Sequence, residues 1–263
     1  MNCSLIITTY NWPEALELCI LSVLSQSVLP DEVIIADDGS TEETKELIQK
    51  LTKNSPIPIL HSWQEDIGFR AARSRNLAIA MSKYNYVVLI DGDMILHKNF
   101  ISDHIANSED GCFIQGSRVI ITKKKSKKVL SKKQLSFSFL EKGLKNRLNA
   151  IHNNLLKSFF TKYTKSHKGI KTCNMSFFKS DCINVNGFNE EFTGWGREDS
   201  EYVERLYNSG IERKNIKFNC IAYHIWHNEN SRNFLCVNDD ILQQAIDEKS
   251  KWCENGINKH IEV

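Results

Sequence analysis

The chain has 263 residues and 41% hydrophobic residues, enough to bury the core of one large α/β domain, which excludes an intrinsically disordered protein. No apolar run has the length of a membrane span, and the N-terminus lacks the basic and apolar blocks of a secretory leader, so we expect a cytoplasmic protein. The eight cysteines are scattered without a CxxC pair, which favours reduced thiols over a zinc ribbon.

The net charge of +2 hides an uneven distribution along the chain. Residues 123–171 hold fifteen Lys or Arg residues against a single acid, Glu141, so the remainder of the chain is net acidic. A basic block of this kind indicates an anionic partner. Composition leaves lipid headgroups, nucleic acid and an acidic glycan open.

The first hundred residues alternate between strand-like and helix-like segments. Apolar runs at 3–10, 31–40, 57–63 and 84–93 predict strands, and helical periodicity predicts helices over 13–26, 40–53 and 71–82. This alternation is typical of βαβ units and predicts a Rossmann-like, mostly parallel central sheet flanked by helices. Ligands are expected at the carboxyl ends of the strands, which carry Thr8, Asp37, Asp38, Asp91 and Asp93.

The rest of the chain divides into two parts, so the organisation we predict is 1–111, 112–171 and 172–263. The middle part has a strand-like start, a lysine run and a helical pattern with one apolar face made by Leu140, Leu144, Leu148, Ile151, Leu155 and Phe159. That face fits a helix packed on the domain and a helix docked on a membrane surface equally well. The third part returns to α/β texture, with a closing helix near 239–254.

The stretch "VVLIDGDMI" runs a buried strand into Asp91 and Asp93, whose side chains can reach the same ion. Hard oxygen ligands suit Mg²⁺ or Mn²⁺ bound together with a diphosphate. An ordinary acidic turn is the structural alternative, and the position after three βα units favours the metal site. In "YHIWHNEN", His224 and His227 stand three apart, and an imidazole at this site would favour Mn²⁺.

Polar residues at the ends of the other strands predict a nucleotide site. Asp38 in "VIIADDGST" can accept from a nucleobase or ribose while the following glycine makes a turn, and Thr8 and Tyr10 can flank a base. Downstream, "GFRAARSRN" offers three arginines that suit phosphate or carboxylate, although all three cannot face one site.

The stretch "FTGWGREDSEYVERL" sets Glu198 and Asp199 side by side where a helix begins. Carboxylates are favoured at helix N-termini by electrostatics alone, and the functional alternative is that one of them is a catalytic base.

The motifs together resemble the metal-dependent, inverting glycosyltransferases of family 2, which have the GT-A fold. "TTYN", "ADDGST", "FRAARSRN" and "DGD" match the nucleotide half, and "CNMSFF", "VNGFNEEFTGWGRED" and "HIWH" match the second half. They span nearly the whole chain, and the "GF…GWGxED" run is the specific one. The likeness is greatest to the transferase domains of bacterial chondroitin polymerases, and more distant to animal β1,4-galactosyltransferases.

The resemblance implies a role for each part and for individual residues. Residues 1–111 become a nucleotide-sugar-binding half, 112–171 a basic, partly helical insertion, and 172–263 the acceptor-binding and catalytic half of a single GT-A domain. The residues implied at the UDP-sugar donor are Thr8, Tyr10, Asn11, Asp38, Arg70, Arg75 and Asp91. The metal, Mn²⁺ with Mg²⁺ as the alternative, would bind Asp93, Asp91 and His227, which matches the family better than His224.

At the acceptor, the resemblance implies that Trp195 stacks on a sugar beside Gly194, that Glu198 holds a hydroxyl, and that Asp199 is the base. A single displacement with a base on one face of the anomeric carbon and a cation on the other inverts the anomer. We expect the helix N-terminus to keep Asp199 ionised. Ser200 and Glu201 replace the further aspartates of the galactosyltransferases, so acceptor contacts differ.

The expected function is transfer of GalNAc, Gal, GlcNAc, Glc or GlcA from a UDP-sugar to a hydroxyl of a glycan or lipid-linked glycan, in bacterial capsule or lipooligosaccharide synthesis. The run Lys123–Lys133 is expected to dock the enzyme peripherally on an anionic inner membrane. A non-catalytic nucleotide- or carbohydrate-binding module on the same fold is the main alternative. Nucleic acid is not an expected partner, because the aromatic residues are not interleaved with the lysines. A sugar-1-phosphate nucleotidyltransferase is not expected either, because the glycine-rich phosphate loop of that class does not appear before "TTYN".

Overall fold

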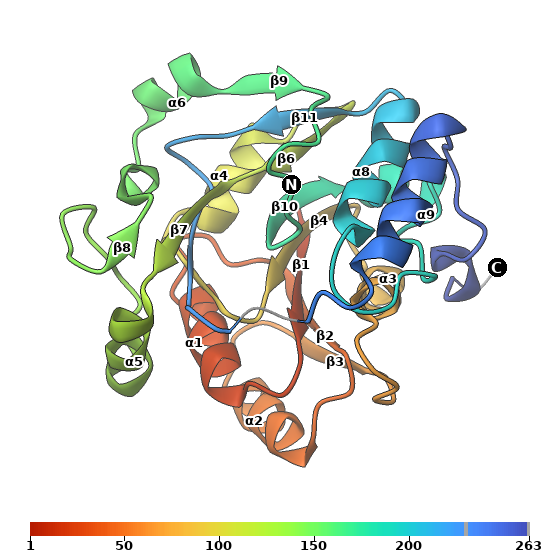
Figure 1. Cartoon of the computed structure of the whole chain (residues 1–263). Coiled ribbons are helices and arrows are strands. Elements are labelled where there is room, and N and C mark those ends of the chain that lie inside the picture. Colours follow the sequence, from red (N-terminus) through yellow and green to blue (C-terminus); the bar gives the residue numbers. More distant parts are fainter. Residues whose placement is uncertain (229–230, 262–263) are drawn as a thin grey trace.

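The structure is a computed structural model that describes residues 1–228 and 231–261. A mixed sheet crosses the molecule, and all the strands that the sequence predicts in the first hundred residues contribute to it (Figure 1). Its order is β3 (Ile59–Trp63), β2 (Glu32–Asp37), β1 (Cys3–Thr9), β4 (Tyr86–Asp91), β10 (Asn174–Phe178), β6 (Cys112–Gln115), β11 (Glu212–Asn215) and β9 (Lys162–Thr164).

The first four strands of this order are parallel, while β10 runs antiparallel between β4 and β6. Helices α1 (Pro13–Leu24), α2 (Glu42–Lys53) and α3 (Ala71–Met81) connect the parallel strands and confirm the three predicted helices. The α/β class and the mostly parallel sheet flanked by helices are therefore confirmed.

Helices bury both faces of the sheet, which explains why β1, β2 and β4 are almost continuously apolar. Leu5 and Ile7 face a core built with α1, α2 and α4 (Phe100–Asn107). Ile6 points the other way, into a core with α3, α7 (Lys179–Asn184) and α8 (Glu198–Asn208). The polar ends of these strands are left at one edge, where the site lies.

A smaller sheet packs beside that edge, in the order β5 (Met94–Leu96), β12 (Ile221–His224), β7 (Ser117–Ile121) and β8 (Leu144–Lys145). Because β5 follows β4 directly and pairs antiparallel with β12, the register places His224 opposite Met94. Residues more than a hundred positions apart in the sequence are thereby brought to the end of β4.

The middle part differs from the sequence expectation. The predicted single helix over 140–159 is wrong, because the segment is broken into β8, a 3-10 turn η1 (Arg147–Ala150) and α6 (Asn154–Phe160). Asn146 turns left-handed with φ 54°, and Asn153 is extended and caps α6 by accepting from the backbone N–H of Leu156 at 2.9 Å. Each break separates apolar positions that a continuous helix would have aligned.

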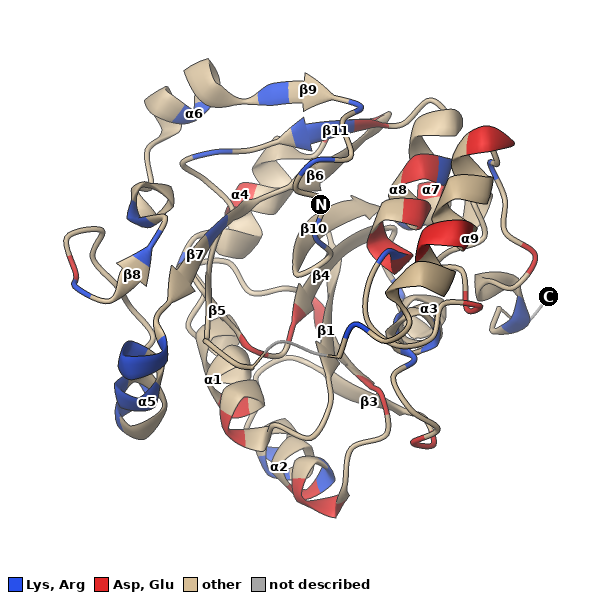
Figure 2. Cartoon of the chain, in the orientation of Figure 1, with Lys and Arg blue, Asp and Glu red and all other residues tan. Residues whose placement is uncertain are grey.

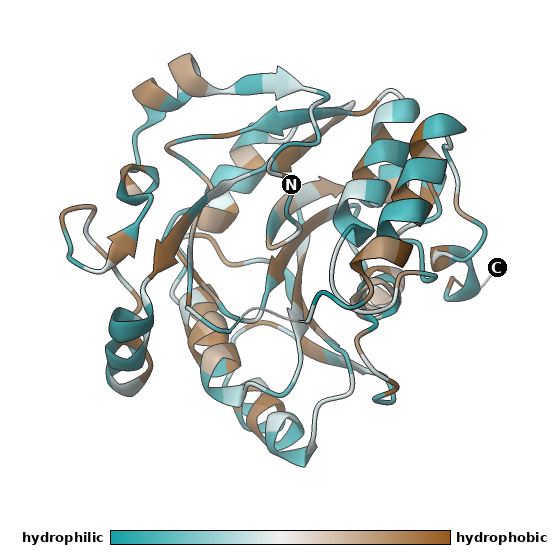
Figure 3. Cartoon of the chain, viewed as in Figure 1, coloured by the Kyte–Doolittle hydropathy of each residue, from teal (hydrophilic) through white to brown (hydrophobic). Residues whose placement is uncertain are grey.

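Most of the predicted apolar face is consequently in solvent. Leu144 is 9% exposed, but the exposed fractions reach 70% for Leu140, 67% for Leu148, 69% for Leu155 and 75% for Phe159. Figure 3 shows the apolar side of α6 at the periphery of the molecule. The interpretation as a helix packed on the domain is therefore wrong.

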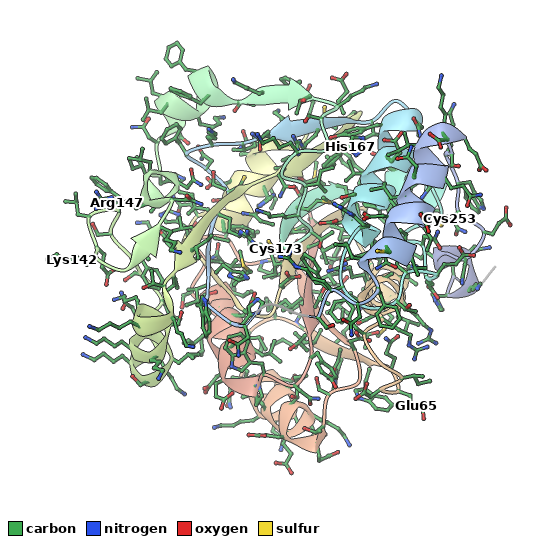
Figure 4. All side chains as sticks on the ribbon, in the orientation of Figure 1. Glu65, Lys142, Arg147, His167, Cys173 and Cys253 are labelled. Carbon is green, nitrogen blue, oxygen red and sulfur yellow. The ribbon has the colours of Figure 1, made fainter. Side chains whose placement is uncertain are left out.

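The lysine run forms a helix of its own, α5 (Lys123–Lys132). Figure 2 shows Lys residues along α5 at the outer edge of the molecule, and Figure 4 shows α5 side chains extending away from the rest of the protein. Only Ser126 and Val129 of this helix are buried.

The last helix, α9 (Leu235–Asp247), starts and ends earlier than the predicted 239–254. It ends early because the chain turns left-handed at Lys249, with φ 51°. It packs against α8 and precedes the short turn η2 (Ile257–Lys259). None of the helices in the described ranges is long and apolar enough to cross a membrane. The three-part division of the chain stays a prediction.

Candidate functional site

Asp93 and the two histidines of "HIWH" meet just beyond the end of β4. The Nε2 atoms of His224 and His227 lie 3.2 and 3.3 Å from Oδ2 of Asp93, and one ligand atom from each residue falls within 4.8 Å of the others. The backbone N–H of Ile225 donates to the carbonyl of Asp93 at 3.0 Å, which fixes the two segments together. The structure thus brings the predicted His227 to Asp93, and His224 as well.

The chemistry of this cluster fits a divalent cation. Oδ1 of Asp93 is buried without a hydrogen-bond partner, and two imidazoles converge on the other oxygen of the same carboxylate. Imidazole nitrogen with carboxylate oxygen suits Mn²⁺ better than Mg²⁺. An unpaired buried carboxylate oxygen is costly unless something binds it.

A second histidine cluster shows the contrast. Asp103, with His97 and His152, also has metal-like spacing. However, both oxygens of Asp103 are already used, since they accept from Asn219 at 2.8 Å, from the backbone of Cys220 at 3.0 Å and from His152 at 3.1 Å. This cluster is a satisfied structural network, whereas Asp93 keeps an open ligand position.

Asp91 is joined to the acid pair of α8 by one buried arginine. Arg75, 4% exposed, places its guanidinium 3.2 Å from Oε1 of Glu198 and 3.8 Å from Oδ1 of Asp91, and lies over the ring of Phe188. Burial raises the pKa of Asp91 to about 6; Arg75 opposes the rise and Asp93 adds to it. Sequence reasoning placed Arg75 near the nucleotide and missed this bridge, which only the packing of α3 against α8 creates.

Asp199 is not kept ionised in the way that we expected. Glu198 and Asp199 do begin α8, after Arg197 with φ 77°, so the predicted helix start is confirmed. Nevertheless burial raises the pKa of Asp199 to about 7, the charge of Glu198 adds to the rise and Arg75 opposes it. Desolvation and a like charge together outweigh the helix dipole, which is worth less than about 2 kcal/mol.

Thr8 and Asp38 lie where the nucleotide is expected. The hydroxyl of Thr8 is buried without a partner, and its carbonyl accepts from Gly92 at 2.7 Å, so β1 and the turn after β4 are held together. Asp38 is 3% exposed and accepts from the backbone N–H of Arg70 at 2.8 Å and from the amide of Gln64. Burial raises the pKa of Asp38.

Tyr10 and Asn11 form the loop above these residues. Tyr10 is 49% exposed and its hydroxyl donates to Asp66 at 2.9 Å. Asn11 has a φ of 45°, accepts from the backbone of Thr41 at 2.8 Å and donates its own backbone N–H to Ser40 at 2.9 Å. Asn11 therefore shapes the loop, and Tyr10 presents an accessible ring.

The arginine segment is divided among separate contacts, as the sequence predicted. The Arg70 guanidinium donates to the carbonyl of Glu65 at 3.2 Å, and Arg73 donates to Gln64 at 2.7 Å. Gln64 thus connects Asp38 with Arg73, a role that sequence reasoning missed because nothing around Gln64 forms a recognisable motif.

Trp195 stands at the rim of an apolar pocket of about 320 Å³, lined also by Ile67, Phe69, Thr193 and Phe234. The indole is 40% exposed. Gly194 has a φ of 68°, donates to the carbonyl of Phe69 at 3.1 Å, and would bring a Cβ within 2.4 Å of the Phe234 ring. A glycine is required here by conformation and by space.

Residues 4–179 match the sequence profile of Glycosyl transferase family 2, and residues 156–228 match that described as the N-terminal domain of galactosyltransferase. The first match covers more than half of the chain. The protein therefore belongs to glycosyltransferase family 2.

Curated relatives include a chondroitin synthase of Escherichia coli, 29% identical over 84% of this chain and 34% of that protein. A hyaluronan synthase of Pasteurella multocida is 28% identical over 84% of this chain and 24% of its own length. The chain thus spans about a third or less of these two relatives.

Among solved structures, S. aureus TarS 1-349 in complex with UDP superposes with a TM-score of 0.62 at 15% identity, over 95% of this chain and 68% of that one. The same protein in complex with UDP-GlcNAc gives 0.59 at 16% identity, over 87% and 60%. These likenesses confirm the GT-A fold.

Proposed function

We propose that this protein is a metal-dependent, inverting hexosyltransferase that moves a sugar from a UDP-sugar to a glycan hydroxyl in the synthesis of a bacterial capsule or lipooligosaccharide. The observation that carries the proposal is that two clusters of acidic residues lie at one edge of the sheet. Asp93 with His224 and His227 offers an open cation site, and Arg75 connects the adjacent Asp91 to the acids of α8. The relatives that make chondroitin and hyaluronan, and the UDP complexes of TarS, support the same class of substrate.

In this proposal Asp199 takes the proton of the acceptor hydroxyl while the hydroxyl oxygen forms a bond to the anomeric carbon. The bond from that carbon to the diphosphate oxygen breaks, and UDP leaves with the electron pair. Mn²⁺ held by Asp93 and the histidines would neutralise the charge on the leaving diphosphate. Glu198, fixed by Arg75, would orient the acceptor hydroxyl, and Trp195 would carry its sugar ring.

At the donor end, the uridine would contact Thr8 and Tyr10. Asn11 and Asp38 would shape the loop around it, and Arg70 would close that loop. The unpartnered hydroxyl of Thr8 and the exposed ring of Tyr10 support this placement. Asp38 would act through the loop that it fixes by accepting from Arg70.

The test is a panel of UDP-sugars with Mn²⁺, with and without chelator, scored for UDP release and for transfer to simple glycosides. We expect one donor to release UDP only with the metal, and faster when an acceptor is present. A folded protein that binds UDP but turns over none of the donors would be the non-catalytic binding module instead.

We further propose that the edge of the molecule formed by α5 docks on an anionic membrane surface that carries a lipid-linked acceptor. Basic α5 lies near the exposed Leu140, because Lys125 of α5 pairs with the neighbouring Glu141, and cations beside exposed apolar side chains are typical of interfacial binding. Liposomes with anionic lipid should bind the wild type. Replacing Lys124, Lys127 and Lys128 by Gln should weaken binding by about 1 kcal/mol per lysine. Equal binding of the triple variant would contradict the proposal.

A further inference from the structure

A second pocket opens at the same sheet edge, and the proposed reaction does not account for its charge. It has a volume of about 230 Å³ and is lined by Arg118, Lys171 and Lys217, together with amide and hydroxyl side chains. No acid is among its lining residues within the described part of the chain. The pocket therefore has three cationic groups and no acidic one to balance them.

The strand register places this pocket beside Asp91, at the end of β4. Asn174 at the start of β10 pairs antiparallel with Ile90 of β4. Cys173, the residue before Asn174, is therefore level with Asp91, and Lys171 lies two residues farther out at this edge. Figure 4 shows Cys173 near the centre of the molecule. The guanidinium of Arg118 lies 3.8 Å from Sγ of Cys173. Arg118 and Lys171 thus flank one thiol next to the site.

Within the described residues, no carboxylate pairs with the cationic groups of this pocket. No ion pair to Arg118, Lys171 or Lys217 is present among residues 1–228 and 231–261. Partial burial and the charge of Arg118 lower the pKa of Lys171, and Asp199 opposes the effect, so Lys171 is within electrostatic reach of the proposed base. Neutral side chains complete the lining: Asn149 donates to the carbonyl of Arg118 at 3.0 Å, which fixes the backbone there.

We propose that this pocket binds an anionic group, a carboxylate or a phosphate, carried by the acceptor saccharide, with Arg118 and Lys171 as its charged contacts. The inference rests on the proposed transferase function and specifies its acceptor. In an inverting displacement the acceptor enters from the side of the base, opposite the leaving diphosphate. The charge of Asp199 reaches Lys171 of the pocket, and in our proposal the diphosphate has its own cation site at Asp93. Arginine and lysine are suited to pair with carboxylate or phosphate oxygens.

The test uses three acceptors that differ only at C6, namely methyl β-glucoside, its 6-phosphate and methyl β-glucuronide, with the donor that the UDP-sugar panel identifies. Wild type should use at least one charged acceptor with a kcat/KM about tenfold or more above the neutral one. In Arg118→Gln and Lys171→Gln that ratio should fall towards one, because the charged acceptor loses its contacts. Lys53→Gln, an exposed lysine on α2, is the matched control and should leave the ratio unchanged.

Preference for the phosphate or for the glucuronide identifies the source of the anion. An unchanged ratio in both pocket variants, or no preference in the wild type, overturns the proposal. The proposal is also overturned if the two substitutions change the selectivity between UDP-glucuronate and UDP-glucose but not the selectivity between acceptors. The anion would then belong to the donor.

Direct binding of the three acceptors, measured by calorimetry without donor, separates the two levels of the argument. Charge-selective binding that is lost in Arg118→Gln, in a protein that never releases UDP, would keep the pocket and overturn the transferase. Donor turnover without charge-selective binding would keep the transferase and overturn the pocket proposal.

Discussion

At the scale of single residues, Asp199 allows the sharpest test of the chemistry. Asp199→Asn removes the proposed base with little change in volume, so transfer should fall by about 10²–10⁴-fold. UDP affinity should stay within a few-fold, because the proposed uridine residues are outside α8. Initial rates and UDP titrations measure both, and Asp247→Asn on the exposed face of α9 is the control. A large loss of UDP affinity would mean that the role is misassigned.

The raised pKa of Asp199, about 7, also predicts a pH dependence. The base works when ionised, so kcat/KM should rise as the pH passes through about 7 and level off above it. Arg75 lowers the pKa of Asp199, and Arg75→Met should shift this limb to higher pH. A profile that is flat from pH 5 to 8 would contradict the assignment.

The same shift has the opposite consequence for stability. Because the folded state raises this pKa, the carboxylate destabilises the fold once the pH exceeds its unfolded value near 4, fully so above about 7. Asp199→Asn should therefore raise the free energy of unfolding at pH 8 by up to about 4 kcal/mol and leave it nearly unchanged at pH 4. Denaturant melts at the two pH values measure this. An Asp199→Asn variant that is less stable than the wild type at pH 8 would contradict the prediction.

Residue chemistry was predictable where a motif specified it and not where packing did. The pairing of Asp93 with a histidine of "HIWH" and the acids at the start of α8 were expected and are where the sequence placed them. Their environments were not predictable, because desolvation of Asp199 and the bridge through Arg75 depend on how α3 packs against α8. Helix-terminus electrostatics alone did not predict the raised pKa of Asp199.

At the scale of elements, the loop before α8 depends on Gly194. Alanine there meets the strain of a φ of 68° and a Cβ only 2.4 Å from Phe234, so Gly194→Ala should destabilise the protein by about 2–3 kcal/mol and weaken acceptor use. Gly210→Ala is the matched control, since its φ is 90° with no atom within 4 Å, and strain alone should cost about 1 kcal/mol. Thermal melts and acceptor KM distinguish the two, and equal losses would show that crowding by Phe234 is unimportant.

The elements of the first half were predictable because each follows from a local pattern. Buried strands alternate with helices that carry an apolar face, and helices cover both faces of the sheet. The middle part failed because its apolar spacing satisfied a helical period while left-handed Asn146 and extended Asn153 interrupted it. Asparagine readily adopts both conformations, and periodicity does not register either.

At the scale of the whole molecule, metal binding should stabilise the fold, because the cluster joins the end of β4 to the end of β12. Mn²⁺ at about 100 times its dissociation constant should add about 2.7 kcal/mol, and a chelator should reverse the effect. His227→Ala and His224→Ala should each reduce the shift, and comparison of the two identifies the stronger ligand. His167→Ala, at a histidine paired with Glu204, is the control. A shift that survives in both cluster variants would place the ion elsewhere.

Arg75 has a consequence for how two ligands communicate. It is a shared counter-ion for Asp91 of β4 and Glu198 of α8. A cation arriving beside Asp91 competes with that guanidinium and leaves it to Glu198, the group that faces the acceptor in our proposal. Donor loading and acceptor affinity are then one linked equilibrium, and by reciprocity each ligand changes the other's dissociation constant by the same factor. A single buried side chain thereby couples donor binding to acceptor binding.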